Sequence, residues 1–250
     1  MDAAHLALIA AAAVIGGAIN AIAGGGSLLT FPALLAAGVP AVSASMTNTI
    51  AMCPGYLSGT FAQRTDLAGQ GRRAAALVPL ALAGSLAGAY ILLHTSERAF
   101  NVIVPFLLVF AAALLGLQPR LRAFLKARSG KPRSIALAAV PIGAAAIYGA
   151  YFGAGLGVIL LAVIAIVIDD TLIRANALKQ LLSLVINVTA AIAFSIVGTV
   201  DWQAAGVVGA GALVGGFVGG TLAARTPEKL LRAIVITAAL VLAAIYFARL

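Results

Sequence analysis

Long apolar runs, separated by short polar segments, make up most of this chain. Between Ala3 and Gln63 there is not a single Asp, Glu, Lys or Arg. About 20 consecutive apolar residues suffice for a helix to cross the hydrocarbon core of a bilayer. A membrane β-barrel would instead need polar and apolar residues in alternation, which these runs do not have. The pattern therefore predicts an all-α polytopic membrane protein.

Eight helical segments are expected from the apolar runs. The runs cover residues 4–37, 41–63, 74–93, 99–117, 135–168, 171–197, 203–224 and 228–250. As one helix the first run would measure about 52 Å, against a hydrocarbon core of about 30 Å. Clustered glycines interrupt both the first and the fifth run. We therefore expect about eight transmembrane helices, of which the first and the fifth are tilted, broken or partly re-entrant.

The two halves of the chain share one order of features, which indicates an internal repeat. At an offset of 131 residues, Gly24 and Gly26 align with Gly155 and Gly157. Residues 1–117 and 135–250 are therefore expected to form two four-helix repeats, each with a first helix broken at its glycines. The segment between them, 118–134, has six basic residues and no acidic one, and is expected to be a cytoplasmic linker. Interrupted helices at corresponding positions of two repeats point to a transporter's binding site.

Other glycines have the small-xxx-small spacing that lets helices approach closely. For these we expect a role in helix packing: Gly84, Gly88, Gly211, Gly215 and Gly219.

Charged residues are scarce and unevenly placed. They make up 9% of the 250 residues, against roughly 25% in soluble proteins, while 63% are hydrophobic and mean hydropathy is +1.12. The net charge of +9 comes from basic residues between apolar runs, which is typical of cytoplasmic loops rather than of a nucleic-acid surface. If all eight runs cross the membrane, ten basic residues lie on the side of the N-terminus and five, including Arg174, on the other. This count predicts that both termini are cytoplasmic.

The sixth run carries the one charge that falls well inside an apolar segment, Lys179. It lies beside a stripe of polar residues at helical spacing, Asn176, Gln180, Ser183 and Asn187. A lysine at the centre of a membrane helix costs about 2.5–3.5 kcal/mol, so it is a candidate for function. The alternative is that Lys179 reaches back to the interface near Arg174 and only stabilises the topology.

The glycine breaks also favour anion binding. A helix that restarts inside a membrane exposes backbone N–H groups at its N-terminus, where the helix dipole attracts negative charge. Ser27 adds a hydroxyl, and Thr47 and Asn48 are the first-half counterparts of the Asn176 region, unless they only bond neighbouring helices. No Asp or Glu lies well inside an apolar run, which disfavours a cation site and a carboxylate proton relay.

The candidate substrate-binding residues come from both halves: Gly24, Gly25, Gly26, Ser27, Thr47, Asn48, Gly155, Gly157, Asn176, Lys179, Ser183 and Asn187. No catalytic residue, metal ligand or cofactor is expected, because paired carboxylates, a histidine-based triad and a metal-ligand set are missing from the sequence. A single cysteine, Cys53, excludes a disulfide within the chain. The alternative function is a cation or metal permease.

Two stretches resemble the signature halves of the sulfite exporter TauE/SafE family, also called the 4-toluene sulfonate uptake permease family. They read GGGSLLTFPALLAAGVPAVSASMTNTIA (24–51) and GAYFGAGLGVILLAVIAIVIDDTLIRANALKQLLSLVIN (149–187). The resemblance implies a non-enzymatic, multi-pass transporter of the bacterial inner membrane with two four-helix repeats. It also implies small sulfur-containing anions, such as sulfite and sulfonates, as substrates. The expected partners are such an anion and the lipid bilayer, not nucleic acid, and a homo-oligomer is left open.

Overall fold

The computed structural model describes residues 2–23, 25–127, 136–167, 170–222 and 228–248. Within these ranges the chain forms eleven helices and no strand, which confirms the predicted all-α class. The helices are α1 (Ala3–Ala23), α2 (Ser27–Ala36), α3 (Ala41–Ala62), α4 (Arg64–Leu67), α5 (Gly71–Leu93), α6 (Glu97–Ala127), α7 (Ala136–Tyr151), α8 (Leu156–Val167), α9 (Leu172–Val197), α10 (Trp202–Leu222) and α11 (Glu228–Phe247). In the described residues α1, α5, α6 and α9 are long and apolar enough to cross a membrane, and shorter apolar helices accompany them.

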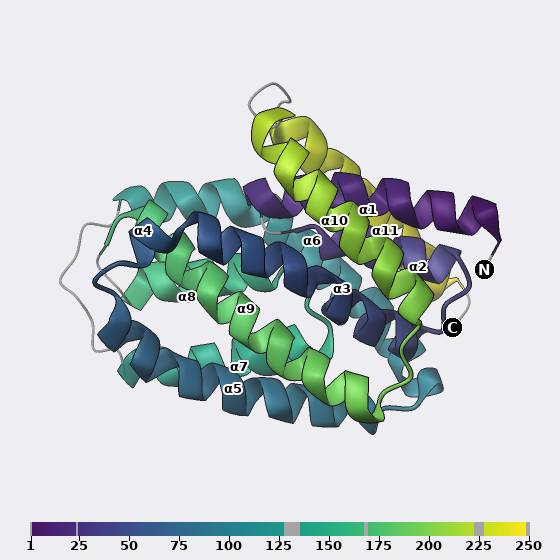
Figure 1. Cartoon of the computed structure of the whole chain (residues 1–250), viewed down its shortest axis with the longest axis horizontal. Coiled ribbons are helices and arrows are strands. Elements are labelled where there is room, and N and C mark those ends of the chain that lie inside the picture. Colours follow the sequence, from purple (N-terminus) through teal and green to yellow (C-terminus); the bar gives the residue numbers. More distant parts are fainter. Residues whose placement is uncertain (1, 24, 128–135, 168–169, 223–227, 249–250) are drawn as a thin grey trace.

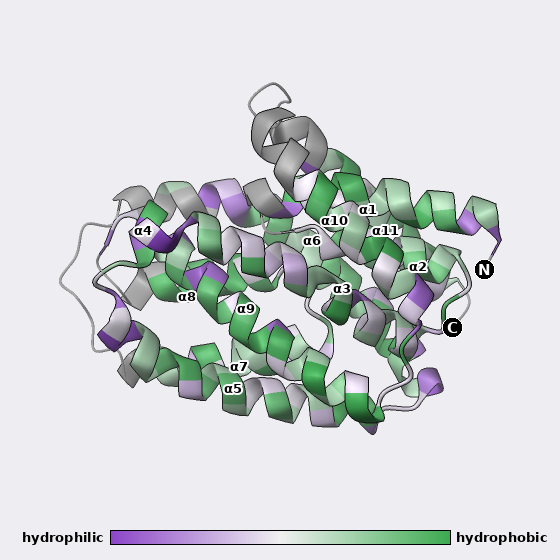
Figure 2. Cartoon of the chain, viewed as in Figure 1, coloured by the Kyte–Doolittle hydropathy of each residue, from purple (hydrophilic) through white to green (hydrophobic). Residues whose placement is uncertain are grey.

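The outer surface of the helix bundle carries many large hydrophobic side chains. Phe61, Val140 and Ile196, for example, are each more than half exposed. Hydrophobic residues run along most of the helices, and hydrophilic ones gather toward the ends, as around α4 (Figure 2). Such a surface is stable against lipid tails, so it fits a chain that crosses a membrane several times.

Helix α6 is longer than the sequence predicts. It continues to Ala127, ten residues past the expected end at Leu117, so the first part of the expected linker is helical. At 31 residues the helix measures about 46 Å, which exceeds the hydrocarbon core. Its basic C-terminal part therefore extends beyond the membrane. The rest of the expected linker, 128–134, lies outside the described residues.

Both predicted helix breaks are present, for different physical reasons. Between α7 and α8, Gly153 and Gly155 have φ angles of +78° and +81°, which favour glycine. Between α1 and α2, Gly26 has an ordinary helical φ of −58°. A Cβ atom there would overlap the carbonyl oxygen of Gly16, so this break needs a glycine for space. Gly24 lies outside the described residues.

The chain turns back on itself at both breaks. A Cβ atom added at Gly16 would lie 3.1 Å from the Gly26 oxygen, so the start of α2 lies against α1. A Cβ atom added at Gly149 would lie 2.7 Å from Cδ2 of Leu156, although seven residues of continuous helix span about 10 Å. Both broken helices are therefore hairpins. In Figure 1, α2 lies toward the end of the molecule that holds both termini, and α8 toward the opposite end.

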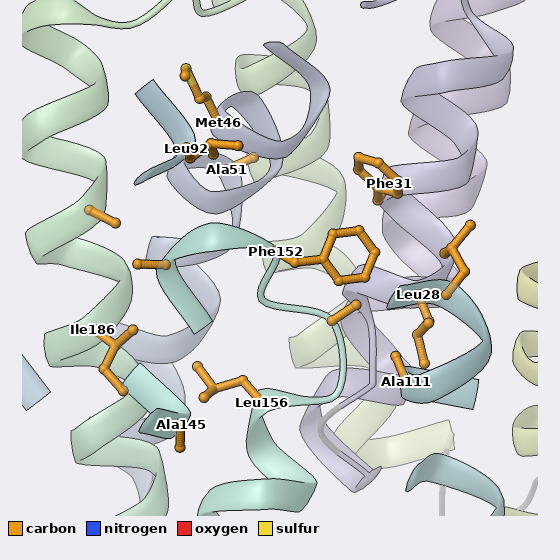
Figure 3. Close-up of a cluster of buried hydrophobic side chains, with 14 of the residues drawn as sticks. Leu28, Phe31, Met46, Ala51, Leu92, Ala111, Ala145, Phe152, Leu156 and Ile186 are labelled. Atoms are coloured by element: carbon orange, nitrogen blue, oxygen red, sulfur yellow. The ribbon is translucent and has the colours of Figure 1, made fainter. Parts of the chain in front are cut away.

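The turn of the second hairpin meets the first hairpin inside the bundle. Phe31 of α2 packs edge-on against Phe152, and their ring centroids are 5.1 Å apart. The Oγ of Ser45 in α3 donates to the backbone oxygen of Tyr151, at 3.1 Å. Around this junction Figure 3 shows buried apolar side chains, among them Leu28, Ala111 and Leu156. The backbone breaks thus lie in protein and not in lipid, where their polar groups would be costly.

Helices α3 and α9 run antiparallel and side by side. Near one end, Ser43 Oγ donates to the backbone oxygen of Thr199, at 2.5 Å. Near the other end, Nδ2 of Asn176 donates to Oε1 of Gln63, at 2.9 Å. The start of each helix therefore lies beside the end of the other, and this register decides which polar residues of the two halves meet.

Glycines bring two further helix pairs into close contact. A Cβ atom at Gly84 of α5 would lie 2.5 Å from the Gly143 oxygen of α7, and one at Gly211 of α10 would lie 2.7 Å from the Cβ of Ala13 in α1. Gly88 and Gly215 are equally crowded by the backbones of α7 and α1. These contacts confirm the predicted packing role of the four glycines, while the surroundings of Gly219 lie outside the described residues.

Gly215→Ala should destabilise the protein by roughly 1–3 kcal/mol, the usual cost of overpacking, because the new Cβ would overlap the Val14 backbone of α1. Gly206→Ala on the same helix is the matched control. Nothing lies within 4 Å of a Cβ there, and alanine is the better helix former, so stability should be kept or raised. Thermal unfolding of the purified protein in detergent, followed by helical circular dichroism, measures both. Equal midpoints for the two variants would contradict this packing.

Candidate functional site

The polar stripe of α9 faces the inside of the bundle. The helix begins after Thr171, whose side chain accepts from the backbone N–H of Arg174, and it continues for 26 residues. Of the stripe and the lysine beside it, Lys179, Gln180, Ser183 and Asn187 are at most 6% exposed, and Asn176 is half-buried. A lysine that reaches the interface would be more exposed than 6%. The structure therefore favours an interior position of Lys179 over snorkelling.

Two atoms of this stripe are buried without a hydrogen-bond partner in the described part of the chain. They are Oε1 of Gln180 and Oγ of Ser183, which lie about one helical turn apart. A buried polar atom that is left unpaired costs about 1–3 kcal/mol, so unpaired atoms of this kind need an explanation. Both atoms adjoin Lys179 on the same helix face, which makes this face a candidate binding surface.

The other polar residues of the stripe already have partners. Asn176 donates to Oε1 of Gln63 at 2.9 Å, and Nδ2 of Asn187 donates to the backbone oxygen of Ser183 at 2.8 Å. Gly59, one turn before Gln63 on α3, leaves room for the Gln180 carboxamide, which a Cβ there would overlap. Gln180 and Ser183, which carry the unpaired atoms, are therefore the stripe's best candidates for substrate contact, and Lys179 is a candidate because it brings a buried positive charge to the same face.

A second polar cluster lies between the first hairpin and α3. Oγ1 of Thr30 donates to Oδ1 of Asn48 at 2.5 Å and lies 3.4 Å from the Gly26 oxygen. Asn20 lies against Gly26, and its Oδ1 is a third buried atom without a partner among the described residues. Ser27, at the start of α2, is also buried.

The structure does not bring all of the predicted binding residues together. Asn48 lies within α3, and Gln63, the residue that caps the end of this helix, follows 15 residues later, or about 22 Å along the axis. Since Gln63 bonds to Asn176, the carboxamides of Asn48 and Asn176 cannot contact the same small anion. Thr47 points elsewhere, because its Oγ1 accepts from the backbone N–H of Asp201 at 3.0 Å.

The helix N-termini at the breaks offer fewer free N–H groups than the sequence suggests. The N–H groups of Leu28 and Leu29 donate to the oxygens of Gly25 and Gly26. In the second hairpin, the N–H of Val158 donates to the Gly155 oxygen in the same way. Gly157 lies inside α8 and is buried. Much of the hydrogen-bonding capacity of the backbone at each break is thus used by backbone groups of the same break.

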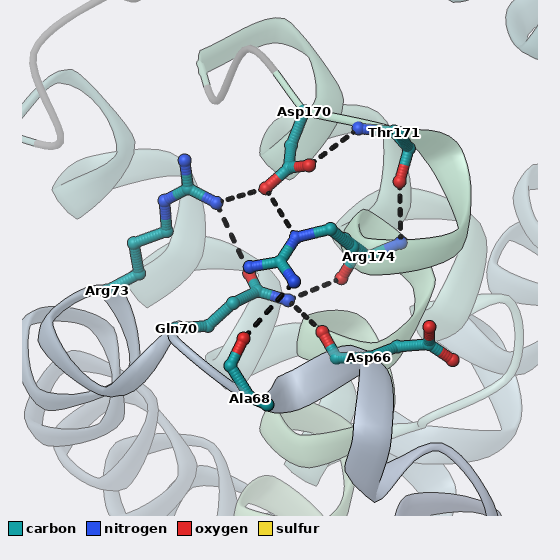
Figure 4. A network of polar contacts seen from close by, with 7 residues as sticks. All are labelled: Asp66, Ala68, Gln70, Arg73, Asp170, Thr171 and Arg174. Atoms are coloured by element: carbon teal, nitrogen blue, oxygen red, sulfur yellow. Dashed lines mark hydrogen bonds and ion pairs between the residues drawn. The ribbon is translucent and has the colours of Figure 1, made fainter.

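At the end of α9 next to this stripe, charged side chains join the two halves of the chain (Figure 4). Arg73 of α5 and Arg174 of α9 both donate to Oδ2 of Asp170, and the Arg174 bond measures 3.0 Å. Burial alone would raise the pKa of Asp170, but the hydrogen bonds from Arg73 and Arg174 outweigh it and hold that pKa below its ordinary value. The ion pairs of Asp170 with Arg73 and Arg174 are therefore at full strength at pH values above the ordinary carboxyl pKa. They weaken as the pH falls through the lowered pKa of Asp170.

This contact contradicts the premise of the eight-crossing charge count. That count places Arg174 on the opposite side of the membrane from Arg73, whereas the two guanidinium groups share one carboxylate oxygen. The physical reason is that the hairpins return to the end at which they start.

Sequence reasoning missed several members of these clusters. The sequence pattern does not indicate a role for Thr30, Gly59 or Gln63, because only the register of the facing helices reveals their contacts. Among the described residues there is no group of three or more His, Cys, Asp or Glu placed to hold a metal ion.

Comparison with known proteins places the chain in one family. A model of the sulfite exporter TauE/SafE family matches residues 8–246. "Probable membrane transporter protein YfcA" of Escherichia coli K12 is 27% identical over 93% of this chain and 86% of its own length. "Probable membrane transporter protein ORF9" of a Sinorhizobium species is 29% identical over 95% of this chain and 90% of its own length. No solved structure matches the chain. Because the family model covers nearly the whole sequence, the protein belongs to the sulfite exporter TauE/SafE family of membrane transporters.

Proposed function

We propose that the protein carries small anions across the inner membrane, and that sulfur-containing anions such as sulfite and sulfonates are its substrates. The observation that carries this proposal is the buried face of α9 around Lys179, Gln180 and Ser183. The choice of sulfur-containing anions follows the name of the family.

The charge of this face favours an anion. Lys179 brings a positive charge into a membrane helix, at a cost of about 2.5–3.5 kcal/mol that a bound anion offsets. The Ser183 hydroxyl can donate to an anion's oxygen, and the Gln180 carboxamide can do so after a rotation that exchanges its N and O. A charge-assisted hydrogen bond of this kind is worth about 1.5–3 kcal/mol.

We propose further that the chain consists of two four-segment repeats of inverted orientation. Each repeat has one re-entrant hairpin (α1–α2, α7–α8) followed by three crossing helices (α3, α5, α6 and α9, α10, α11). The pairing of α5 with α7 and of α10 with α1 supports this, as does the antiparallel pairing of α3 with α9. The membrane is then crossed six times and not eight.

With six crossings the basic residues divide far less evenly. Thirteen of the 16 Lys and Arg residues fall on the side where Arg73 and Arg174 meet Asp170, which we call the Asp170 cluster. Two fall on the side of the termini, and Lys179 lies between the two sides. Because basic loops stay in the cytoplasm, we propose that the Asp170 cluster is cytoplasmic and that both termini are outside. This orientation replaces the cytoplasmic termini that eight crossings would give.

Purified protein in proteoliposomes should move sulfite, sulfate, thiosulfate or sulfoacetate and should not move divalent cations. Lys179→Gln should lower the flux of the transported anion by about tenfold to a hundredfold, because it removes a charge-assisted hydrogen bond worth about 1.5–3 kcal/mol. Arg120→Gln removes an exposed charge from α6 and serves as the control, with flux like the unchanged protein. Wild-type flux in Lys179→Gln, or transport of divalent cations alone, would overturn the proposal.

The orientation can be read from two single cysteines placed in a Cys53→Ala background. Arg72 and Arg98 are both exposed. Arg72 lies in the first turn of α5, which is about 34 Å long, and Arg98 lies beyond its other end. A membrane-impermeant maleimide added to intact spheroplasts should label Arg98→Cys and leave Arg72→Cys unmodified. The reverse pattern would contradict the proposed orientation.

A further inference from the structure

We call the end of the bundle that carries thirteen of the Lys and Arg residues the basic end. The charged cluster there has the features of a latch between the two halves of the chain. It consists of Gln70, Arg73, Asp170 and Arg174, and we call it the Asp170 latch (Figure 4). Arg73 stands in the first turn of α5, whereas Asp170 lies just before α9 and Arg174 in its first turn. None of these residues belongs to the buried polar face around Lys179, Gln180 and Ser183.

Several hydrogen bonds tie the connection between α3 and α5 to α9. Nε2 of the buried Gln70 donates to the backbone oxygens of Arg174, at 3.0 Å, and of Asp66, at 2.8 Å. Nη1 of Arg174 donates to the Ala68 oxygen, at 3.1 Å. Asp170 is 13% exposed, and the N–H of Thr171 bonds its second oxygen, at 2.8 Å. The connection is thus fixed over the first turn of α9.

The latch lies next to the candidate substrate face. Asn176, which bonds to Gln63, follows Arg174 by two residues, and Lys179 follows it by five, or about 7.5 Å of helix. The first turn of α9 therefore lies between Lys179 and this end of the bundle. A site in the middle of the bundle can exchange with each side in turn only if such an end opens and closes.

Asp170 is the member on which the closed arrangement depends. Its carboxylate is the shared partner of two guanidinium groups, one from each half of the chain. If the carboxylate were neutral, Arg73 and Arg174 would face each other as two like charges, which repel. Loss of this one charge therefore turns an attraction between the halves into a repulsion.

We propose that the Asp170 latch is the gate of the basic end, and that Asp170 is the positioning residue that holds it closed over the polar face of α9. This inference rests on the proposed function of that face. Opening separates the connection between α3 and α5 from the start of α9 and gives water and the anion access to Lys179 and Ser183.

The gate can be tested by thiol labelling, which needs no transport. Ser183 is fully buried, so Ser183→Cys in the Cys53→Ala background is a near-isosteric reporter of access. The reagent is an impermeant maleimide, applied to membrane vesicles of the orientation in which Arg72→Cys reacts. Asp170→Asn should speed labelling of the reporter by at least about tenfold, the change that a latch weakened by about 1.4 kcal/mol produces.

Asp66→Asn is the matched control, since it removes the same charge from a carboxyl that points away from the latch in Figure 4. It should change the labelling rate by less than about twofold, well under 1 kcal/mol. If Asp170→Asn fails to give a single gel-filtration peak in detergent, Arg73→Gln on the facing helix takes its place, with the same expected increase. An unchanged labelling rate in these latch variants, or an equal increase in Asp66→Asn, would overturn the gate. The flux of Lys179→Gln tests the proposed function separately and does not affect this outcome.

Discussion

A bilayer has no water in its core with which backbone or side-chain polar groups can bond, and this constraint governs the arrangement of the whole chain. Each break in an apolar helix is placed where the protein itself supplies partners. In the first hairpin, the carbonyl groups of Gly25 and Gly26 accept from the N–H groups of Leu28 and Leu29. In the second, the hydroxyl of Tyr148 donates to the Ala154 oxygen at 2.5 Å. The hairpins therefore fold inward and meet at Phe31 and Phe152.

The same constraint singles out the few groups that lack such partners. Gln180 and Ser183 bring unpaired atoms to a buried face where Lys179 adds a positive charge. Three residues after Asn48, where the repeat expected from the sequence would align with Lys179, stands Ala51, which packs near Gly209 of α10. Only one half of the chain thus contributes a charge. The polar face of α9 is therefore cationic, whereas the cluster around Thr30 and Asn48 is neutral.

The features that depend on local pattern could be predicted from the sequence. The all-α class, the positions of both helix breaks and the packing role of Gly84, Gly88, Gly211 and Gly215 follow from hydrophobic runs and glycine spacing. The features that depend on long-range pairing could not. The reversal at each break and the antiparallel register of α3 and α9 separate Asn48 from Asn176 and place Arg174 beside Arg73. Candidate residues chosen by analogy between the halves therefore fall into two clusters and not one.

The central claim is that the unpaired groups on α9 contact the transported anion, and equilibrium binding to purified protein tests it most directly. Ser183 and Ser85 are both fully buried, but the Ser85 hydroxyl donates to the Ile186 oxygen at 2.7 Å while the Ser183 hydroxyl has no partner in the described residues. With a radiolabelled anion that the flux assay identifies, Ser183→Ala should weaken binding by about tenfold, as loss of one hydrogen bond to a charged ligand predicts, and Ser85→Ala should bind like the unchanged protein. Unchanged affinity in Ser183→Ala, or an equal loss in Ser85→Ala, would contradict the assignment of this face as the binding site.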